Sequence, residues 1–299
     1  MIYVATFEFV VPTTIRFQSF SGFSVRGFFY KIMGIGDQRL AEELHAGKAL
    51  APFSVTPVTI EAAGRELVSY DRLDPGLARF SLVMMRPELG SSLQKALQGG
   101  LSSITLSDQE LPLASIRLES LDPLAIPEEP VKSFELNFWT PTFFRATPLD
   151  LSKQYGLSES LTTPYRYVPL PDPILTFRSL VRTWREFVGS EGLEELMTWV
   201  ESGGIVLSGF PTGIYTRRVY EHPMGNKWVV GFVGRTRFSA SSPLYSERMA
   251  SLASKLLKFG EICGVGGGRT SGLGRYRMTS KPQDELPQEE LPPDAPEGL

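Results

Sequence analysis

A tyrosine, a histidine and a lysine within the first fifty residues have side chains suited to proton transfer and charge stabilisation. Tyr30, His45 and Lys48 are separated by fifteen and three residues. Histidine binds and releases protons near neutral pH, and a cation stabilises the negative charge that builds up on a reacting phosphate. RNA carries its own nucleophile, the 2′-hydroxyl, so these groups could cleave it without a metal ion. A lone histidine near a helix end is, however, more often a structural or surface residue.

The segment 260–274 contains seven glycines and follows an amphipathic stretch. Glycine permits positive φ angles and close backbone approach, so its N–H groups can turn outward and bind phosphate oxygens. Arg269 and Arg275 add positive charge, and we do not expect the segment to build a core. It lacks the Gly-Lys-Ser/Thr ending of a Walker loop. It also follows a predicted helix and precedes a strand, whereas a dinucleotide-binding fingerprint follows a strand and opens a helix. A mobile glycine loop is the alternative.

Charge is distributed unevenly along the chain. The formal net charge is −3, but residues 281–299 carry six acids and one lysine, so the rest of the chain carries +2. Residues 217–280 hold eleven Lys or Arg and three Glu. A local surplus of this kind is what binding to a polyanion requires, although a solvated basic face would have the same composition.

Composition disfavours several other classes of protein. The one cysteine, Cys263, excludes an internal disulfide, and with only His45 and His222 besides, we expect no transition-metal site and no cofactor. The apolar runs are far shorter than the ~18 to 20 residues of a membrane span. The N-terminus does not have the pattern of a signal peptide. We therefore expect a cytoplasmic protein that does not contact a membrane.

Strand and helix periodicities alternate through the N-terminal part. Tyr3, Phe7 and Phe9 share one side of an extended chain, which is typical of a strand. Asp37 could cap a short helix that ends before Gly47. In order, we expect strand 2–11, helices 24–33 and 37–46, strands 54–60, 67–70 and 79–85, helix 88–97, and strands near 104 and 116.

The same order of elements recurs after a proline-rich, acidic stretch at 121–130, which predicts a linker. It comprises strand 134–139, helices 174–188 and 193–200, strands 205–220 and 228–238, helix 244–259, and a strand from residue 276. The fold class is therefore α+β, with two tandem ferredoxin-like (RRM-like, βαββαβ) domains and a disordered acidic C-terminal tail. We expect an N-terminal domain at 1–122, a linker at 123–133, a C-terminal domain at 134–280 and a tail at 281–299.

At these positions the sequence resembles the repeat-cleaving endoribonucleases that form the sixth CRISPR-associated (Cas) protein family, within the RAMP superfamily. The resemblance lies in four stretches: Leu44-His45, Pro-Phe-Ser-Val-Thr-Pro at 52–57, Val-Gly-Phe-Val-Gly-Arg-Thr-Arg at 230–237, and Gly-Arg-Thr-Ser-Gly-Leu-Gly-Arg-Tyr at 268–276. It covers most of residues 1–280 and does not include the acidic tail.

This resemblance implies a metal-independent endoribonuclease with paired ferredoxin-like domains. Such enzymes bind CRISPR repeat RNA and cut it once per repeat, leaving a 5′-hydroxyl and a 2′,3′-cyclic phosphate. By position, the resemblance implies that His45 is the general acid/base and that Tyr30 is the tyrosine that acts with it. Family members often carry the catalytic cation nearer to residues 52–55, so Lys48, Lys31 or an arginine could supply it here. The residues expected to bind RNA are Lys31, Arg235, Arg237, Gly264, Gly266, Gly267, Gly268, Arg269, Thr270, Ser271, Gly272, Gly274 and Arg275.

Two other functions remain open at this point. A non-catalytic RAMP subunit that holds crRNA in an effector complex would have no need of Tyr30 and His45. An RNA-binding adaptor could instead use its acidic tail to compete with RNA for the basic face. As partners we expect CRISPR repeat RNA and a CRISPR effector complex, and the protein is expected to be a monomer or a homodimer. Phe7, Phe9 and Tyr165 are candidates for base stacking, although such residues more often lie in a core.

Overall fold

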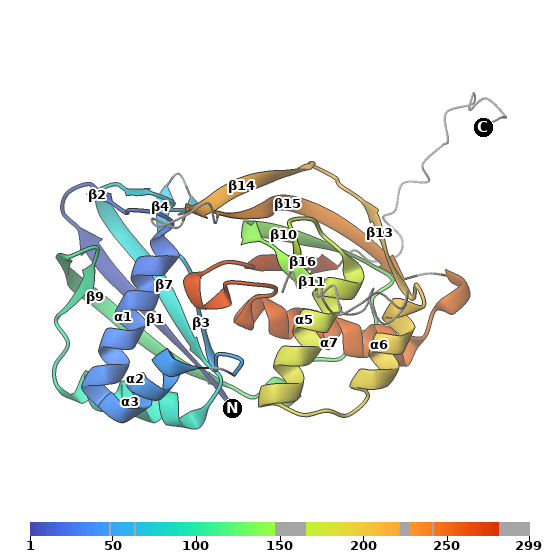
Figure 1. Ribbon diagram of the computed structural model, residues 1–299, viewed down its shortest axis with the longest axis horizontal. Coiled ribbons are helices and arrows are strands. Elements are labelled where there is room, and N and C mark those ends of the chain that lie inside the picture. Colours follow the sequence, from blue (N-terminus) through green and yellow to red (C-terminus); the bar gives the residue numbers. More distant parts are fainter. Residues whose placement is uncertain (48, 63, 147–165, 222–227, 241, 281–299) are drawn as a thin grey trace, which may run out of the picture.

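Two halves, each with an antiparallel sheet and packed helices, lie side by side in the protein (Figure 1). The computed structural model describes residues 1–299 apart from 48, 63, 147–165, 222–227, 241 and 281–299. Lys48, Tyr165, His222 and the acidic tail, all named above, lie outside the described residues. No helix in the described part of the chain is long and apolar enough to cross a membrane.

The N-terminal half consists of one sheet with helices against it. Its elements are β1 (Ile2–Val11), β2 (Ile15–Arg16), α1 (Ser21–Gly36), α2 (Gln38–Ala46), β3 (Phe53–Val55), β4 (Thr59–Ala62), β5 (Arg65–Val68), β6 (Arg72–Leu73), β7 (Gly76–Met84), α3 (Pro87–Gln98), β8 (Ser103–Leu106) and β9 (Gln109–Leu121). The sheet order is β5-β4-β7-β1-β9-β8, with β3 also paired to β7. Phe7 and Phe9 of β1 are fully buried, and Phe7 packs on Phe28 of α1, so both are core residues.

The C-terminal half repeats this arrangement. Its elements are β10 (Ser133–Thr142), β11 (Phe144–Ala146), β12 (Arg166–Val168), α5 (Pro173–Phe187), α6 (Leu193–Glu201), β13 (Ile205–Gly209), β14 (Ile214–Glu221), β15 (Trp228–Ala240), α7 (Glu247–Cys263), the short 3₁₀ helix η3 (Arg269–Ser271) and β16 (Tyr276–Ser280). The sheet order is β13-β15-β10-β16, with β14 paired to β15.

Both sheets have the strand order of a ferredoxin-like fold. In each half the opening strand lies between two antiparallel neighbours, β1 between β7 and β9, and β10 between β15 and β16. These neighbours are the third and the last strand of the βαββαβ series. The predicted fold class, two tandem ferredoxin-like domains, is therefore confirmed.

Several element boundaries differ from the sequence predictions; for example, α1 extends on both sides of the predicted helix 24–33, and the predicted strand 54–60 is divided into β3 and β4. The strand expected over 205–220 is divided into β13 and β14, because the chain turns between Phe210 and Gly213, where Gly213 has φ of +76°. The helix expected over 244–259 begins later and ends later. Ser246 caps its N-terminus by accepting the N–H of Met249, and α7 continues to Cys263, four residues into the glycine-rich segment.

Apolar and cation–π contacts join the two halves. A small cluster of buried residues combines one side chain from the N-terminal half with three from the C-terminal half: Phe20, Phe143, Val219 and Leu273. Beside it, β14 extends toward β4 at the edge of the N-terminal half, and the guanidinium of Arg217 lies 4.0 Å from the ring centroid of Tyr70.

The predicted linker is fastened to α7 by two ion pairs. Glu128 accepts a hydrogen bond from Lys255 at 2.7 Å, and Glu129 accepts one from Lys258 at 3.0 Å. The Lys255 side chain is only 9% exposed, so its pairing has little competition from water. This part of the chain therefore packs on the C-terminal half.

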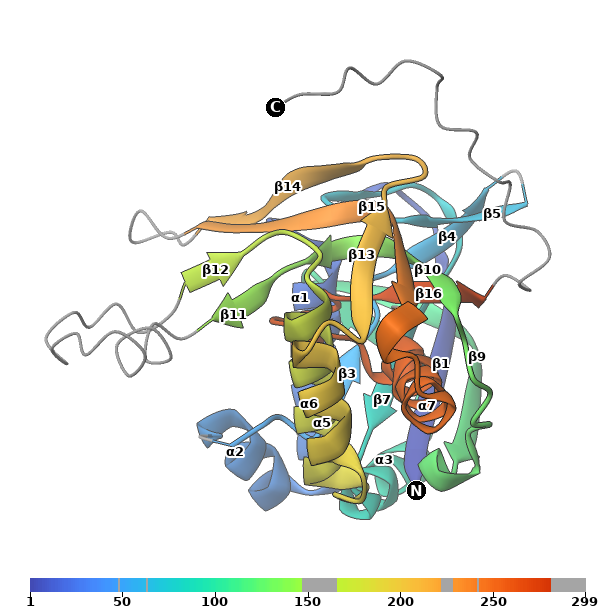
Figure 2. The ribbon, with the colours of Figure 1, turned by 90° about the vertical axis from the view of Figure 1, so that its right-hand side faces the viewer.

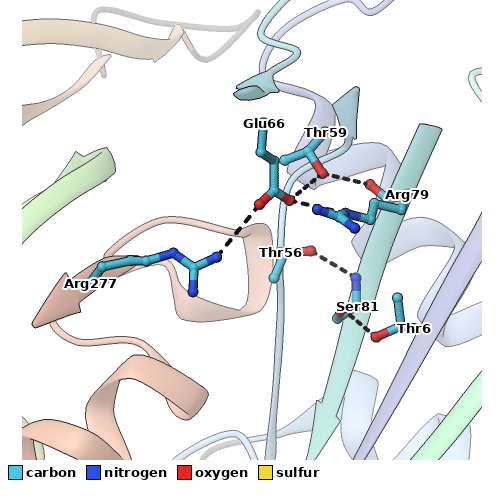
Figure 3. A network of polar contacts seen from close by, with 7 residues as sticks. All are labelled: Thr6, Thr56, Thr59, Glu66, Arg79, Ser81 and Arg277. Atoms are coloured by element: carbon cyan, nitrogen blue, oxygen red, sulfur yellow. Dashed lines mark hydrogen bonds and ion pairs between the residues drawn. The ribbon is translucent and has the colours of Figure 1, made fainter. Parts of the chain in front are cut away.

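A polar network at β5 and β16 adds an ion pair between the halves (Figure 3). Glu66 accepts a hydrogen bond from the hydroxyl of Thr59 at 2.7 Å and one from Arg79 at 3.2 Å, and Arg277 lies 3.5 Å from its other oxygen. Burial would raise the pKa of Glu66. The Thr59 hydroxyl, Arg79 and Arg277 outweigh this effect and hold the pKa below its usual value of 4.5.

Replacing Glu66 with glutamine should cost about 1 kcal/mol or less of unfolding free energy at neutral pH, because the carboxylate is partly exposed. A carboxylate whose pKa is depressed on folding stabilises the protein above its unfolded pKa, and this stabilisation is lost as the pH falls through the folded pKa. The difference between Glu66→Gln and wild type should therefore shrink as the pH falls below about 4.3, the ordinary pKa of a glutamate, and be absent in stronger acid, as measured by denaturant titrations. Glu119→Gln, on the exposed face of β9, serves as the control. A difference that persists in acid would contradict the assignment.

Candidate functional site

Tyr30 and His45 come together in a hollow between α1 and α2. Asp37 is responsible for the turn, because its N–H donates to the carbonyl of Met33 at the end of α1 and its carboxylate accepts the N–H of Leu40 at the start of α2. The chain thereby folds back and places His45, in the last turn of α2, against Tyr30 of α1. Their ring centroids are 5.0 Å apart and the ring planes are nearly perpendicular, at 83°.

The hollow is open to solvent and has a volume of about 670 Å³. Its walls include Tyr30 and Lys31 of α1 and His45 of α2. The His45 side chain is exposed and Tyr30 is half-buried. A hollow of this kind can admit a phosphate and its neighbouring ribose while leaving the imidazole accessible to water.

Burial of Tyr30 raises the pKa of its phenol above the usual value of 10.0, although Arg26 opposes the shift. The ring packs edge-on against Phe53, at a centroid distance of 5.7 Å. At neutral pH the phenol is therefore protonated and available as a hydrogen-bond donor.

Lys31 is the one lysine or arginine among the described residues that line the hollow. Its ammonium donates a hydrogen bond to the hydroxyl of Thr105 on β8 at 3.1 Å, in an exposed position. The other predicted cation, Lys48, lies outside the described residues.

Two polar residues in the wall of the hollow were not predicted. The amide of Gln38 donates to Glu42 at 2.9 Å, and both side chains line the hollow. Glu42 precedes His45 by three residues, which places both on one face of a helix. That spacing was visible in the sequence and could have identified them.

The glycine-rich segment is mostly buried, contrary to the expectation that it would not contribute to a core. Val265 and Leu273 are fully or nearly fully buried, and Val265 donates its N–H to the carbonyl of Gly274 at 2.9 Å. A side chain at Gly272 would approach the backbone nitrogen of Pro57 to 2.7 Å, in the N-terminal half. At Gly274, with φ of +73°, a β-carbon would overlap the carbonyl of Val265. The glycines therefore allow the segment to pack tightly between the halves.

Most backbone donors of this segment are used inside the protein. Gly266 donates to the hydroxyl of Ser179 on α5, and Gly267 to the carbonyl of Phe143. The N–H groups of Gly264, Ser271, Gly272 and Gly274 likewise have backbone acceptors. In the described part of the chain no acceptor is found for the N–H groups of three consecutive residues: Gly268, Arg269 and Thr270. Of the backbone N–H groups predicted to bind phosphate, these three are therefore the ones that remain candidates.

Arg275 is completely enclosed and connects the two halves. It is 2% exposed, and its guanidinium donates to the carbonyl of Val55 from Nε and NH2, to the hydroxyl of Ser54, and to the carbonyl of Ile262 at 2.5 Å. Burial lowers its pKa to about 10. These contacts favour a structural role over the RNA contact expected from the sequence.

Arg269 is also buried, at 5% exposure, but its hydrogen bonds are incomplete. Its one such bond to a described residue, from NH1 to the carbonyl of Cys263, is long at 3.5 Å. Burial lowers its pKa, Cys263 acts in the opposite direction, and the nearby Arg182 lowers it further.

Arg235 and Arg237 share one carboxylate on the C-terminal sheet. Glu135 of β10 accepts two hydrogen bonds from Arg237, at 2.9 and 3.1 Å, and lies 3.8 Å from Arg235. The two arginines keep 29% and 45% of their side chains exposed. They could still contact a phosphate, but with a charge partly neutralised by Glu135.

The surplus of basic residues over 217–280 is largely balanced by acids from elsewhere in the chain. Besides Arg235 and Arg237, four of these basic residues form ion pairs with carboxylates from other segments, namely Arg248 with Glu195, Lys255 with Glu128, Lys258 with Glu129 and Arg277 with Glu66. The sequence composition therefore overstated the free positive charge of this region.

Comparison with known proteins gives one matching family model and several solved structures of similar fold. Residues 136–276 match the family model described as CRISPR-associated endoribonuclease Cas6. No curated protein matches the chain. Among solved structures, the product complex of Cas6 (TTHB231) from Thermus thermophilus has a TM-score of 0.70 and 19% identity, covering 93% of this chain and 100% of that one. The product complex of Cas6 (TTHA0078) has a TM-score of 0.65 and 21% identity, with coverages of 94% and 100%.

The match extends to a more distant structure, a Cas6-related protein from Pyrococcus furiosus, with a TM-score of 0.55, 11% identity, and coverages of 93% and 98%. The sequence match comprises the C-terminal half, including α5, α7, the glycine-rich segment and the start of β16. The structural match comprises nearly the whole chain. The resemblance of this protein to the Cas6 family of CRISPR-associated endoribonucleases is therefore confirmed.

Proposed function

We propose that this protein is a metal-independent endoribonuclease that cuts CRISPR precursor RNA once within each repeat. The observation that carries the proposal is the edge-to-face pair of Tyr30 and His45 in an open hollow that also contains Lys31. A protein that only binds RNA has no use for such a group of proton-transferring side chains. RNA as the ligand is further supported by a solved neighbour, at TM-score 0.54 and 10% identity, that is described as a RAMP protein binding different RNA substrates.

In the proposed reaction the 2′-hydroxyl before the scissile bond attacks the adjacent phosphorus. Its proton passes to a base, the bond between phosphorus and the 5′-oxygen breaks, and the leaving 5′-oxygen takes up a proton. The products are a 2′,3′-cyclic phosphate and a 5′-hydroxyl. His45 is assigned the proton transfer, because an imidazole can both accept and donate a proton and this one is exposed in the hollow.

Tyr30 and Lys31 are assigned to the charge that develops on the phosphate. The phenol of Tyr30 is protonated and donates a hydrogen bond to a non-bridging oxygen. Lys31 supplies the positive charge from the adjacent position on α1, and Lys48 remains a second candidate for that role. Donors already in place stabilise a transition state without reorganising during the reaction, which is why a small number of such groups is effective.

The assay that tests the proposal is incubation of the protein with a panel of labelled CRISPR repeats, both hairpin and unstructured, in excess EDTA. We expect a single cut in one repeat class and a 3′ fragment that a kinase can label directly at its 5′-hydroxyl. The 5′ fragment should be ligated through a 3′-hydroxyl only after its cyclic phosphate has been opened and removed. Tight binding without cutting would instead assign the protein to the non-catalytic RAMP subunits. A cytoplasmic location, an effector complex as partner and the oligomeric state all remain predictions.

A further inference from the structure

Three arginines form an exposed stripe on α5, outside the hollow and outside the glycine-rich segment. Arg178, Arg182 and Arg185 are separated by four and three residues, so they lie along one face of the helix. Together with α6 they line a depression of about 360 Å³, whose floor includes Val181 and Met197. The family resemblance noted from the sequence did not involve these residues.

The two outer arginines lie within ion-pair distance of carboxylates on α6, but the middle one does not. Arg178 donates two hydrogen bonds to Glu201, at 3.1 and 2.9 Å, and Arg185 lies 4.0 Å from Glu194. Within the described residues, Arg182 has no carboxylate at ion-pair distance and no hydrogen-bond acceptor. Other arginines of the C-terminal half, namely Arg235, Arg237, Arg248 and Arg277, do have carboxylate partners.

Arg182 also lies beside a second cation whose hydrogen bonds are incomplete. The buried Arg269 is close enough for the charge of Arg182 to lower its pKa. One turn before Arg182, Ser179 holds the N–H of Gly266 and so fixes the glycine-rich segment against α5. Two guanidinium groups held near each other without a carboxylate repel, and an anion between or beside them would remove that repulsion.

The glycine-rich segment connects this stripe to the hollow of Tyr30 and His45. Its 3₁₀ turn η3 packs against α1, where Ser271 lies over Gly22, and its beginning is tied to α5 through Gly266. Figure 2 shows α1, α2, α5 and α6 on the same side of the molecule. A ligand could therefore run along this side of the molecule from the hollow, past the partly buried backbone of Gly266–Gly268, to Arg182.

We propose that Arg182, at the centre of the α5 stripe, binds a backbone phosphate of the RNA at a distance from the scissile bond. This inference rests on the proposed function for the identity of the ligand. Arg178 and Arg185 lie on either side of Arg182, and their charges are partly offset by Glu201 and Glu194 of α6. We therefore expect most of the binding energy of this site to come from Arg182. The planar guanidinium fork suits a phosphate group, and such contacts carry no base specificity.

Binding assays with Arg182→Gln test the inference on its own. The probe is the repeat that the wild type cuts, made uncleavable by a 2′-deoxy nucleotide at the cut site. Between roughly 50 and 200 mM salt, we expect an affinity loss of ~10-fold and a salt-dependence slope smaller by ~0.7, the value for one single-strand phosphate contact. With the cleavable RNA at saturation, the single-turnover rate should equal that of the wild type, because the contact is remote from the reacting atoms.

Two further variants give the comparison. Arg248→Gln removes an exposed arginine from α7 that is paired with Glu195 at 2.8 Å, and it should leave affinity and slope unchanged. Arg182→Lys should retain most of the salt slope but less of the affinity, because the charge remains and the fork is lost.

Equal affinity and slope for wild type and Arg182→Gln, or equal losses for Arg182→Gln and Arg248→Gln, would overturn the inference and leave the proposed endoribonuclease intact. Failure of the wild type to bind any repeat would instead overturn the proposed function.

Discussion

His45→Ala should slow the cleavage step by ~10²-fold or more, with little change in RNA affinity. The imidazole is exposed in the hollow and meets Tyr30 at its edge, so its removal eliminates the proposed proton transfer without disturbing a core. The measurement is the single-turnover rate with a labelled repeat at saturating protein, together with a binding curve for the 2′-deoxy substrate. A loss confined to the rate would identify a group that acts on the reacting atoms.

His222 provides the matched control, because it is the only other histidine in the chain. His222→Ala should cut at the wild-type rate. Tyr30→Phe, which removes only the phenolic hydroxyl, should cut more slowly than wild type but faster than His45→Ala. Cleavage that proceeds normally in His45→Ala would leave an endoribonuclease whose mechanism depends on positioning of the RNA, and it would remove His45 from the site.

Arg275→Met should lower the unfolding free energy by roughly 3 kcal/mol, the largest stability change that we expect from a single substitution. Methionine fills a similar volume but leaves the carbonyls of Val55 and Ile262 and the hydroxyl of Ser54 without their donors. Each buried polar group deprived of its partner costs about 1 to 3 kcal/mol. Because Val55 and Ser54 belong to the other half, the loss should appear in denaturant unfolding of the whole chain.

Arg277→Met is the control for this prediction. Arg277 is two residues away on the same strand and also reaches the N-terminal half, but its side chain is 70% exposed and its contact with Glu66 is 3.5 Å long. It should therefore cost less than about 1 kcal/mol. If Arg275→Met were as stable as Arg277→Met, its four buried hydrogen bonds would not be important for stability, and its burial would have to be explained by another role.

The elements that carry the site could be predicted from the sequence because their signals are local. Asp37 and Gly47 bracket α2 as expected, and the carboxylate of Asp37 caps the helix. The turn that brings His45 back to Tyr30 follows from that cap. The order of strands and helices was recognised in both halves for the same reason, since alternation and helical periodicity depend only on neighbours along the chain.

The role of the glycine-rich segment could not be predicted, because it depends on residues from distant parts of the chain. Its composition indicated an open loop, but the space that most of its missing side chains would need is occupied by Pro57, Phe143, Val265 and Leu273. The basic surplus over 217–280 was misleading for a similar reason. Its partners Glu66, Glu128 and Glu135 precede it by about a hundred residues or more, and no count within the segment could include them.

Because the glycine-rich segment holds the two halves together, its freedom to evolve is restricted. A substitution between Gly264 and Gly274 that altered RNA affinity would in most cases also alter folding, so the two properties would be inherited together. A lineage adapting to a new repeat would find few tolerated changes there. Variation should accumulate instead on the exposed side chains of α5 and β15, where the chemistry presented to RNA can change while the joint between the halves stays the same.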